Sequence, residues 1–136
     1  MKILLLLFSL CSVLLFLTIQ KKKTLEESIA DGQMIYHDFC MQCHLPSGQG
    51  VEGAFPPLAQ ADYLFENIDR SIASVKYGSQ GSIVINSVEY PGNMTNLGLD
   101  NQEIADVMNY ILHSWGNSYD QMITAEHVKS IEPRTN

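Results

Sequence analysis

Basic residues are scarce in this sequence, and half of them lie close to its start. Lys2 and the Lys21–Lys23 cluster supply four of the eight. All 15 acidic residues lie from Glu26 onward. Residues 24–136 therefore carry 15 acids against four bases, a net charge of −11. A surface of this charge excludes nucleic acid as a partner, because such binding needs a basic face. The acidity either steers encounter with a basic patch on a partner protein or serves only solubility.

Cysteine is also scarce, and its placement limits the chemistry. Cys11 lies in an apolar run, and the other two form the stretch Cys40-Met41-Gln42-Cys43-His44. A thioredoxin-like dithiol would need a βαβ pattern around this stretch, and the sequence lacks one. A zinc site would need a further sulfur or nitrogen ligand at finger spacing, which is also missing.

The same stretch matches the C-x-x-C-H signature of c-type haem attachment. Each thiol adds across one haem vinyl group, and the two intervening residues let one helical turn bridge both vinyls. The imidazole of His44 then lies under the iron as its proximal ligand. We therefore predict one covalent haem c held by Cys40, Cys43 and His44. A haem would also add apolar core to a single small domain, which alone buries little surface.

The apolar run Ile3–Ile19 is long enough to cross a bilayer, for which roughly 17 to 25 residues suffice. We predict that residues 1–23 form a single-pass anchor, with a cleaved signal peptide as the alternative. Ser28-Ile29-Ala30 has the side chains of a cleavage site but lies far downstream. Haem attachment requires export, so we place the haem domain on the periplasmic side of a bacterial inner membrane. The Lys21–Lys23 cluster conflicts with this orientation, since such clusters normally stay cytoplasmic.

The remaining pattern is mainly helical. Helices are expected at 25–44, 61–65, 68–77 and 100–115, each from apolar spacing of three to four residues or from capping residues. Within the first, Gly32 indicates close approach of another helix. Residues 82–90 alternate weakly and form either a hairpin or extended chain. The tail, 118–136, is expected to be a loosely held extension with a short helix near 125–131.

The segment 46–58 is a Pro- and Gly-rich loop, which we expect to wrap the haem edge. The carbonyls of Pro56 and Pro57 are placed to accept the second imidazole N–H of His44, which would orient the ring. Leu58 would then pack on the porphyrin.

A methionine thioether is the sixth ligand typical of electron-transfer haems. Met94 is the candidate, because it lies in a loop 50 residues after His44. The other methionines fall within the first helix, in the attachment motif, on an apolar helix face or in the polar tail; they are Met34, Met41, Met108 and Met122. His37 is expected to be solvated, and His113 would need a polar helix face turned inward.

With these motifs in this order, the chain resembles a single-haem, class I type cytochrome c. The resemblance covers about residues 30–117 and rests on four segments. They are Gly32-x-x-x-Tyr36 before the C-x-x-C-H stretch, Gly53-Ala54-Phe55-Pro56-Pro57-Leu58, Tyr90-x-Gly92-x-Met94, and the segment from Leu99-Asp100 to Trp115-Gly116-Asn117. It implies an all-α fold of three to five helices around the haem, in which first and last helices cross near Gly32 and Tyr110. It also implies His44/Met94 ligation. Thr95 stands where many relatives have proline, which implies a less rigid loop.

The predicted function is electron transfer by a haem that cycles between ferric and ferrous states in a respiratory chain, without enzymatic activity. Relatives of this type accompany dehydrogenases, reductases and oxidases. Their resemblance implies a dehydrogenase or quinol-oxidising complex as donor and a terminal oxidase or reductase as acceptor. The alternatives are a haem subunit of an enzyme complex, or a peroxidase or sensor with an open sixth site, which would need a distal acid–base pair.

Overall fold

The computed structural model describes residues 22–133. In chain order its elements are α2 (Leu25–Ile35), the π-helical turn η1 (Tyr36–Cys40), α3 (Met41–His44), α4 (Asp62–Glu66), α5 (Ile68–Tyr77), β1 (Ile83–Ile85), β2 (Val88–Tyr90), α6 (Asn101–Leu112) and α7 (Ala125–Ser130). The predicted all-α fold is confirmed, with one small hairpin added to it. Almost all of the predicted anchor, 1–23, lies outside the described residues. None of the helices within 22–133 has the length and apolar character to cross a membrane.

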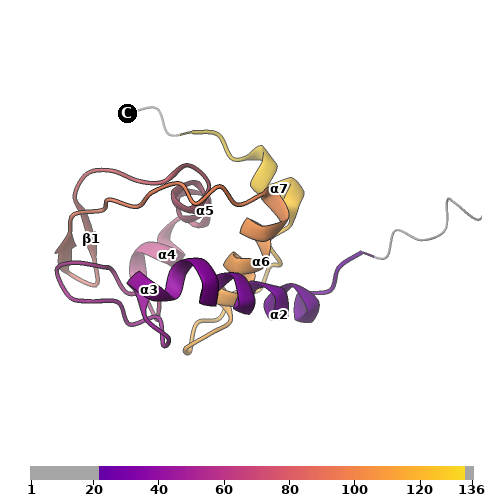
Figure 1. The fold of residues 1–136 in the computed structure, drawn as a ribbon, viewed down its shortest axis with the longest axis horizontal. Helices are drawn as coiled ribbons and strands as arrows, with labels where there is room; N and C mark the ends of the chain where they lie inside the picture. Colours follow the sequence, from indigo (N-terminus) through magenta and orange to yellow (C-terminus); the bar gives the residue numbers. More distant parts are fainter. Residues whose placement is uncertain (1–21, 134–136) are drawn as a thin grey trace, which may run out of the picture.

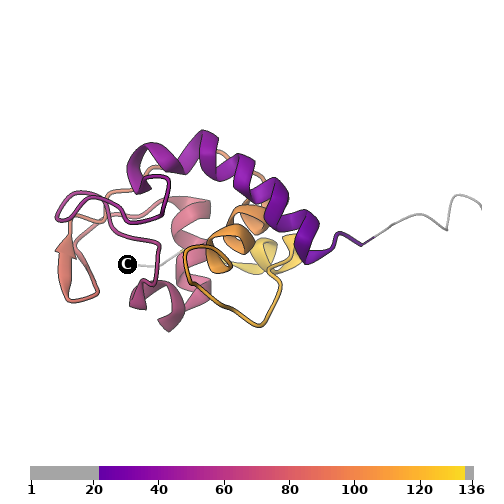
Figure 2. The same ribbon diagram turned by 90° about the horizontal axis from the view of Figure 1, so that it is seen from below.

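Two helices far apart in the sequence form the framework. Both ribbon views show α2 lying across α6 (Figures 1 and 2). The two backbones meet at Gly32, where an added Cβ would lie 2.0 Å from the carbonyl oxygen of Asp106 and 2.9 Å from Cβ of Tyr110. The predicted close approach is therefore confirmed, and it occurs beside Tyr110 as the family resemblance implies.

The predicted first helix, 25–44, forms with an irregularity before the thiol motif. Thr24 and Glu27 make the expected capping box at its start. At η1 the helix widens to a π turn, in which the N–H of Met41 donates to the carbonyl of Tyr36. Both Tyr36 and Cys40, at the two ends of this turn, are buried. The wider turn thus brings both side chains to the inner face.

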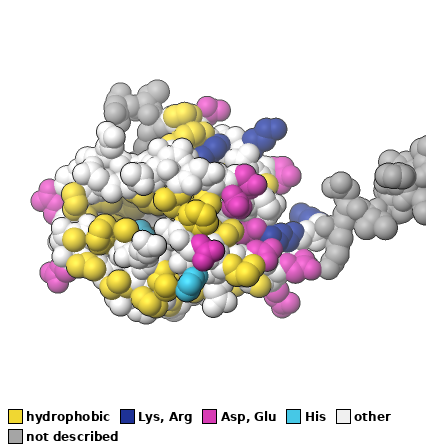
Figure 3. Space-filling model, viewed as in Figure 1, with side chains coloured by type: hydrophobic (Ala, Val, Ile, Leu, Met, Phe, Trp, Pro, Cys, Tyr) yellow, Lys and Arg dark blue, Asp and Glu magenta, His cyan; other side chains and the backbone are white. Residues whose placement is uncertain are grey.

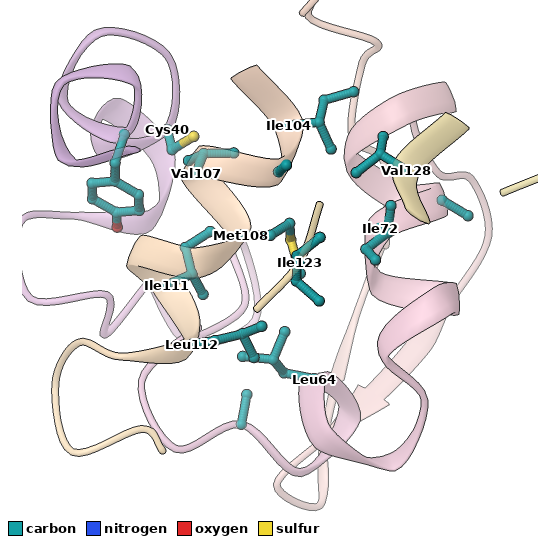
Figure 4. Packing of buried hydrophobic residues seen from close by; sticks show 14 of the residues in the cluster. Cys40, Leu64, Ile72, Ile104, Val107, Met108, Ile111, Leu112, Ile123 and Val128 are labelled. Atoms are coloured by element: carbon teal, nitrogen blue, oxygen red, sulfur yellow. The ribbon is translucent and has the colours of Figure 1, made fainter. Parts of the chain in front are cut away.

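The apolar face of α6 is the centre of the core. The close-up shows its side chains directed toward α5, α7 and the region of Cys40 (Figure 4). Of the six residues predicted for this face, five are buried in α6: Ile104, Val107, Met108, Ile111 and Leu112. The sixth, Trp115, lies beyond the end of the helix.

The helix ends at Leu112, not at Trp115 as predicted. Trp115 has a left-handed backbone, with φ of 54°. Its ring centroid lies 5.0 Å from that of Tyr36 and 5.5 Å from that of Tyr110. Asn117 donates to the carbonyls of Ile111, at 2.8 Å, and Leu58, at 2.9 Å. These aromatic and amide contacts stabilise a chain reversal that helical periodicity does not reveal.

Between the haem motif and α6, the helix and the hairpin begin, turn and end where their own residues predict. Asn67 caps α5 by accepting from the N–H of Arg70, and Gly78 ends it with φ of 80°. Residues 82–90 form a hairpin, not extended chain, because β1 pairs antiparallel with β2. Asn86 and Ser87 turn it with φ of 50° and 66°, a geometry that matches the twist of paired strands.

The prediction of a loosely held tail is wrong for its described part. Ile123, Val128 and Ile131 are buried in the core, and α7 packs against α6. The side chain of Asn109 bonds both the carbonyl and the N–H of Ile123, each at 2.8 Å. Lys76 donates to the carbonyl of Ile131 at 2.9 Å. The short apolar set was missed because its residues are separated by polar ones and become apolar surface only against α5 and α6.

We expect Ile123→Ala to lower the free energy of unfolding by about 2 to 5 kcal/mol, because it leaves a cavity beneath α6. Denaturant unfolding followed by circular dichroism measures this. Glu126→Ala on the exposed side of α7 is the control, with an expected change within about 0.5 kcal/mol. A loss of equal size in the two variants would show that the tail is not part of the core.

Candidate functional site

A cavity opens between the thiol motif, the following loop and the hairpin. The space-filling view is hollowed on this side, with hydrophobic side chains around the hollow (Figure 3). Its walls come from α3, the loop 54–58, α5, β1, the loop 92–97 and α6. None of the described residues that line it is Asp, Glu, Lys or Arg. The cavity therefore suits a large apolar group with few polar atoms.

Both thiols of the motif line this cavity. Cys40, at the end of η1, is 6% exposed, and Cys43, within α3, is partly exposed. Both are free. Burial raises the pKa of the Cys40 thiol to about 11, and the nearby Cys43 charge adds to this shift. Cys40 is thus mainly a neutral thiol at neutral pH.

His44 is held by the loop that follows it. Its Nδ1 lies 2.9 Å from the carbonyl oxygen of Pro56. A carbonyl only accepts, so Nδ1 carries the proton and Nε2 presents a lone pair. Burial lowers the pKa of His44, and the Pro56 bond offsets part of that effect. The ring is therefore neutral near pH 7, which is the form that binds a metal.

The predicted carbonyl bond is confirmed, and Pro56 makes it. Pro57 and Leu58 line the same cavity, and their contact with the cofactor stays a prediction. The loop is fixed at its far end by backbone bonds from Leu58 and Ala59 to the carbonyl of Gly48, at 2.7 Å and 2.9 Å. These bonds, with that of the Asn117 side chain to the Leu58 carbonyl, place the Pro56 carbonyl within hydrogen-bond distance of the imidazole.

At Gly50 the backbone of this loop leaves no room for a side chain. It has φ of 64°, and an added Cβ would lie 2.3 Å from the carbonyl oxygen of Phe55 and 2.6 Å from that of Pro56. Its N–H donates to the carbonyl of His44 at 3.0 Å. Gly50 thus sits between His44 and the carbonyl that orients it.

We expect Gly50→Ala to raise the reduction potential of the bound haem by on the order of tens of millivolts, because a displaced Pro56 carbonyl makes His44 a weaker donor. Redox titration followed by absorbance measures the potential. Gly53→Ala is a matched control, with φ of 71° and nothing within 4 Å of the added Cβ. In both variants the alanine must adopt a left-handed backbone, which costs about 1 to 2 kcal/mol of stability. A shift in reduction potential that occurs in Gly50→Ala alone therefore supports the role of the Pro56 carbonyl.

Two methionines line the cavity. Met94 lies in the loop 92–97, where its N–H and carbonyl exchange bonds of 3.0 Å and 2.9 Å with Ser79. Met108 reaches the cavity from α6 and is 1% exposed. Met34, Met41 and Met122 do not line it. Ligation by Met94 stays a prediction, and its loop position leaves it freer to approach a metal than the core residue Met108.

The remaining histidines considered for a ligand role lie elsewhere. The side chain of His37 is 70% exposed, as predicted for a solvated residue. His113 bonds the carbonyl of Asn109 through Nδ1 at 2.8 Å. Neither lines the cavity.

Several residues that line the cavity do not belong to any of the sequence motifs. Phe39, Tyr63 and Ile83 line the cavity from three different segments. Phe39 was detectable from its position directly before Cys40, whereas Tyr63 and Ile83 reach the cavity only through the packing of α4 and the hairpin.

The residues present fit a haem c. Two thiols at the correct spacing, a neutral imidazole with a defined lone pair and a thioether surround one apolar cavity. Imidazole and thioether are ligands of haem iron in electron-transfer proteins, and an apolar wall matches the macrocycle.

Comparison with known proteins agrees with this geometry. Residues 29–115 match the family described as cytochrome c. The chain is 39% identical over 114 residues to cytochrome c-552 of Thermus thermophilus, covering 77% of this chain and 86% of the relative. It is 30% identical over 104 residues to the cytochrome c subunit of the quinone alcohol dehydrogenase of Gluconobacter oxydans, covering 74% of this chain but 21% of that subunit. The chain thus belongs to the cytochrome c family, a family of electron carriers that bind a covalent haem c.

Proposed function

We propose that this protein transfers electrons in a respiratory chain through one six-coordinate haem c, with His44 and Met94 as axial ligands. The observation that carries the proposal is the convergence of Cys40, Cys43, His44 and Met94 on one apolar cavity. When bound, the haem supplies one-electron chemistry between its ferric and ferrous states. The protein holds the ligand atoms: the Pro56 carbonyl orients His44, and Ser79 holds the backbone of Met94.

An open-site haem peroxidase or sensor is less well supported. Such a protein needs a distal acid–base pair beside the iron. Among the described residues that line the cavity, His44 is the one histidine and there is no carboxylate or guanidinium. The polar groups on the other walls are hydroxyls and an amide, from Tyr63, Ser71, Ser74, Ser79, Asn93 and Thr95. These do not form an acid–base pair near pH 7.

The partners follow from the proposed chemistry and from the relatives. One relative is the cytochrome subunit of a dehydrogenase, so its domain serves within a larger complex. For this chain we propose a dehydrogenase or quinol-oxidising complex as donor and a terminal oxidase or reductase as acceptor. A role as the haem subunit of such a complex is the second candidate.

The proposal includes an uncleaved leader that tethers the haem domain to the outer face of a bacterial inner membrane. The contacts of Lys23, at the end of the predicted anchor, argue against cleavage downstream of this residue. Its Nζ lies 2.6 Å from carboxylate oxygens of both Asp31 and Asp106. Burial alone lowers the pKa of Lys23, but the bonds to Asp106 and Asp31 and their charges outweigh it and raise the pKa. Lys23 is therefore charged, and it pairs a carboxylate, Asp106, that is almost fully buried.

A residue shortly after Lys23 also belongs to the buried core. Ser28 is fully buried, donates to Asp106 at 2.6 Å and accepts from Asn109 at 2.8 Å. Cleavage after Ala30 would remove this serine together with Lys23 and leave Asp106 buried with fewer partners, at a cost of several kcal/mol. We therefore expect any mature form to retain Lys23.

Expression of the full-length chain with haem-attachment machinery, followed by membrane fractionation, tests the proposal. We expect haem c in the membrane fraction, a sharp α band on reduction and a weak Met–iron charge-transfer band on oxidation. Intact mass spectrometry should give the full-length chain plus one haem. A high-spin spectrum would contradict six-coordination. A soluble haem protein that lacks residues 3–19 would contradict the retained tether, and one that begins downstream of Lys23 would also contradict the expected retention of that residue.

A further inference from the structure

The end of α5 contacts two parts of the chain that lie far from it in sequence. One is residues 123–131, which we call the C-terminal segment, and the other is the loop 92–97, which contains Met94. The close-up shows Val128 of the C-terminal segment facing Ile72 of α5 (Figure 4). Both of these side chains are fully buried. The C-terminal segment and α5 therefore share one part of the core.

Lys76 and Tyr77, the last two residues of α5, hydrogen-bond to the C-terminal segment. The Lys76 ammonium donates to the carbonyls of Val128, at 2.8 Å, and Ile131, at 2.9 Å. The Tyr77 hydroxyl donates to the same Ile131 carbonyl at 2.8 Å. These bonds satisfy carbonyls at the C-terminal end of α7, where the helix itself provides no donor. Neither Lys76 nor Tyr77 lines the haem cavity.

The two residues that follow contact the loop 92–97. Gly78 has φ of 80°, and an added Cβ would lie 2.6 Å from the carbonyl oxygen of Met94. Ser79 and Met94 exchange backbone hydrogen bonds of 2.9 Å and 3.0 Å. The Ser79 hydroxyl donates to the carbonyl of Gly92 at 2.8 Å. Residues 76–79 thus connect the C-terminal segment directly to the proposed iron ligand.

The loop 92–97 depends on this connection for its shape. Among the described residues, its pairing with Ser79 is the one bridge of regular structure in the loop. A movement of Ser79 therefore moves the backbone of Met94. A side chain that binds a metal must be held to within about 0.5 Å of its productive position, so such a movement weakens ligation.

We propose that the C-terminal segment keeps Met94 in position to ligate the haem iron, with Lys76 and Tyr77 as the positioning residues. This rests on the proposed function, because it takes Met94 as the sixth ligand. Lys76 and Tyr77 act through the backbone of Gly78 and Ser79. When their bonds to the C-terminal segment are lost, the end of α5 moves more easily and Met94 leaves the iron more often.

Imidazole binding to the ferric, haem-loaded full-length protein in detergent measures how firmly Met94 is held. A nitrogen lone pair of imidazole forms a bond to ferric iron while the Met94–iron bond breaks, and no electron or proton is exchanged. At saturating imidazole, the observed rate is the rate at which Met94 leaves the iron. Stopped-flow absorbance gives this rate. The measurement is made at a pH where imidazole is neutral, so that the charge of Lys76 does not alter its approach.

We expect Lys76→Met combined with Tyr77→Phe to raise the saturating rate about tenfold, because the hydrogen bonds to the C-terminal segment are lost. Tyr77→Phe alone removes one of these bonds and should raise the rate about twofold to threefold. Lys129→Met is the matched control. It removes a lysine charge from the exposed surface of α7 and leaves the bonds of Lys76 in place, so its rate should stay within about twofold of the unsubstituted protein.

A second control separates positioning from global stability. Gly32→Ala disturbs the contact of α2 with α6, which does not involve the C-terminal segment or the loop 92–97. Its saturating imidazole rate should stay within about twofold of the unsubstituted protein, although its unfolding free energy is lower. Hydrogen exchange of the ferrous protein, followed by NMR, gives a readout at single residues. The amide N–H groups of Ser79 and Met94 should exchange faster in the Lys76→Met and Tyr77→Phe double variant than in Gly32→Ala.

An unchanged imidazole rate in the double variant, or an equal rise in Gly32→Ala, would overturn the proposal. If the unsubstituted protein shows the Met–iron charge-transfer band, either of these results rejects only the positioning role and leaves the proposed function intact. Absence of that band from the unsubstituted ferric protein is a different result. It would overturn ligation by Met94, and the positioning role with it.

Discussion

Replacing Met94 with alanine is expected to lower the reduction potential by on the order of 100 mV or more, within the about 0.8 V range that axial ligands span. A thioether favours ferrous iron, so its loss stabilises the ferric state. The oxidised protein should also lose its Met–iron charge-transfer band. Redox titration and absorbance spectroscopy of the purified haem protein measure both effects.

Met108→Leu is the matched control for this experiment. Met108 lines the same cavity and is buried in α6, and leucine preserves its volume and apolar character. We expect the band to persist and the potential to remain close to that of the unsubstituted protein. Loss of the band in Met108→Leu and its survival in Met94→Ala would move the sixth ligand to α6.

The second large effect is expected for Gly32→Ala, which should lower the free energy of unfolding by about 2 kcal/mol. The added Cβ would lie 2.0 Å from a backbone oxygen, so α2 and α6 must separate. Overpacking of this kind costs about 1 to 3 kcal/mol and at times more. The better helix propensity of alanine returns only about 1 kcal/mol. The loss is a large share of a typical stability of about 5 to 15 kcal/mol.

Chemical denaturation followed by far-ultraviolet circular dichroism measures this loss. Ala30→Ser, on the exposed side of the same helix, is the control and should cost about 0.5 kcal/mol. A Gly32→Ala protein as stable as this control would show that the helices do not touch at Gly32 in solution.

Local features of the fold were predictable because their causes lie within a few residues. The Thr24 and Asp100 capping boxes, the Asn67 cap and the stop at Gly78 all form as the residues indicate. The turn at Asn86 and Ser87 belongs to the same class, since these two residues tolerate positive φ well enough to close a hairpin.

The predictions from sequence were wrong where contacts with distant residues determine the structure more strongly than the neighbouring residues do. Helical spacing continues to Trp115, but the packing of its ring with Tyr36 and Tyr110 ends α6 at Leu112. The tail looked polar, yet Ile123 is buried because Asn109 in α6 satisfies its backbone. Periodicity within one segment contains no information about such partners.

The sequence by itself determined the chemistry of this protein, because haem attachment depends on thiols and an imidazole at fixed spacing within one helical turn. It also placed a proline carbonyl and a loop methionine as the other parts of the site. Only the tertiary structure decided that Pro56 makes the bond to His44, that Ser79 holds the backbone of Met94, and that Met108 shares the cavity. The ion pair of Lys23 with the buried carboxylate of Asp106 belongs to the same class. The loop bonds to Gly48 bring Pro56 to His44, and the packing of the helices brings the residues that lie farther apart in the chain together.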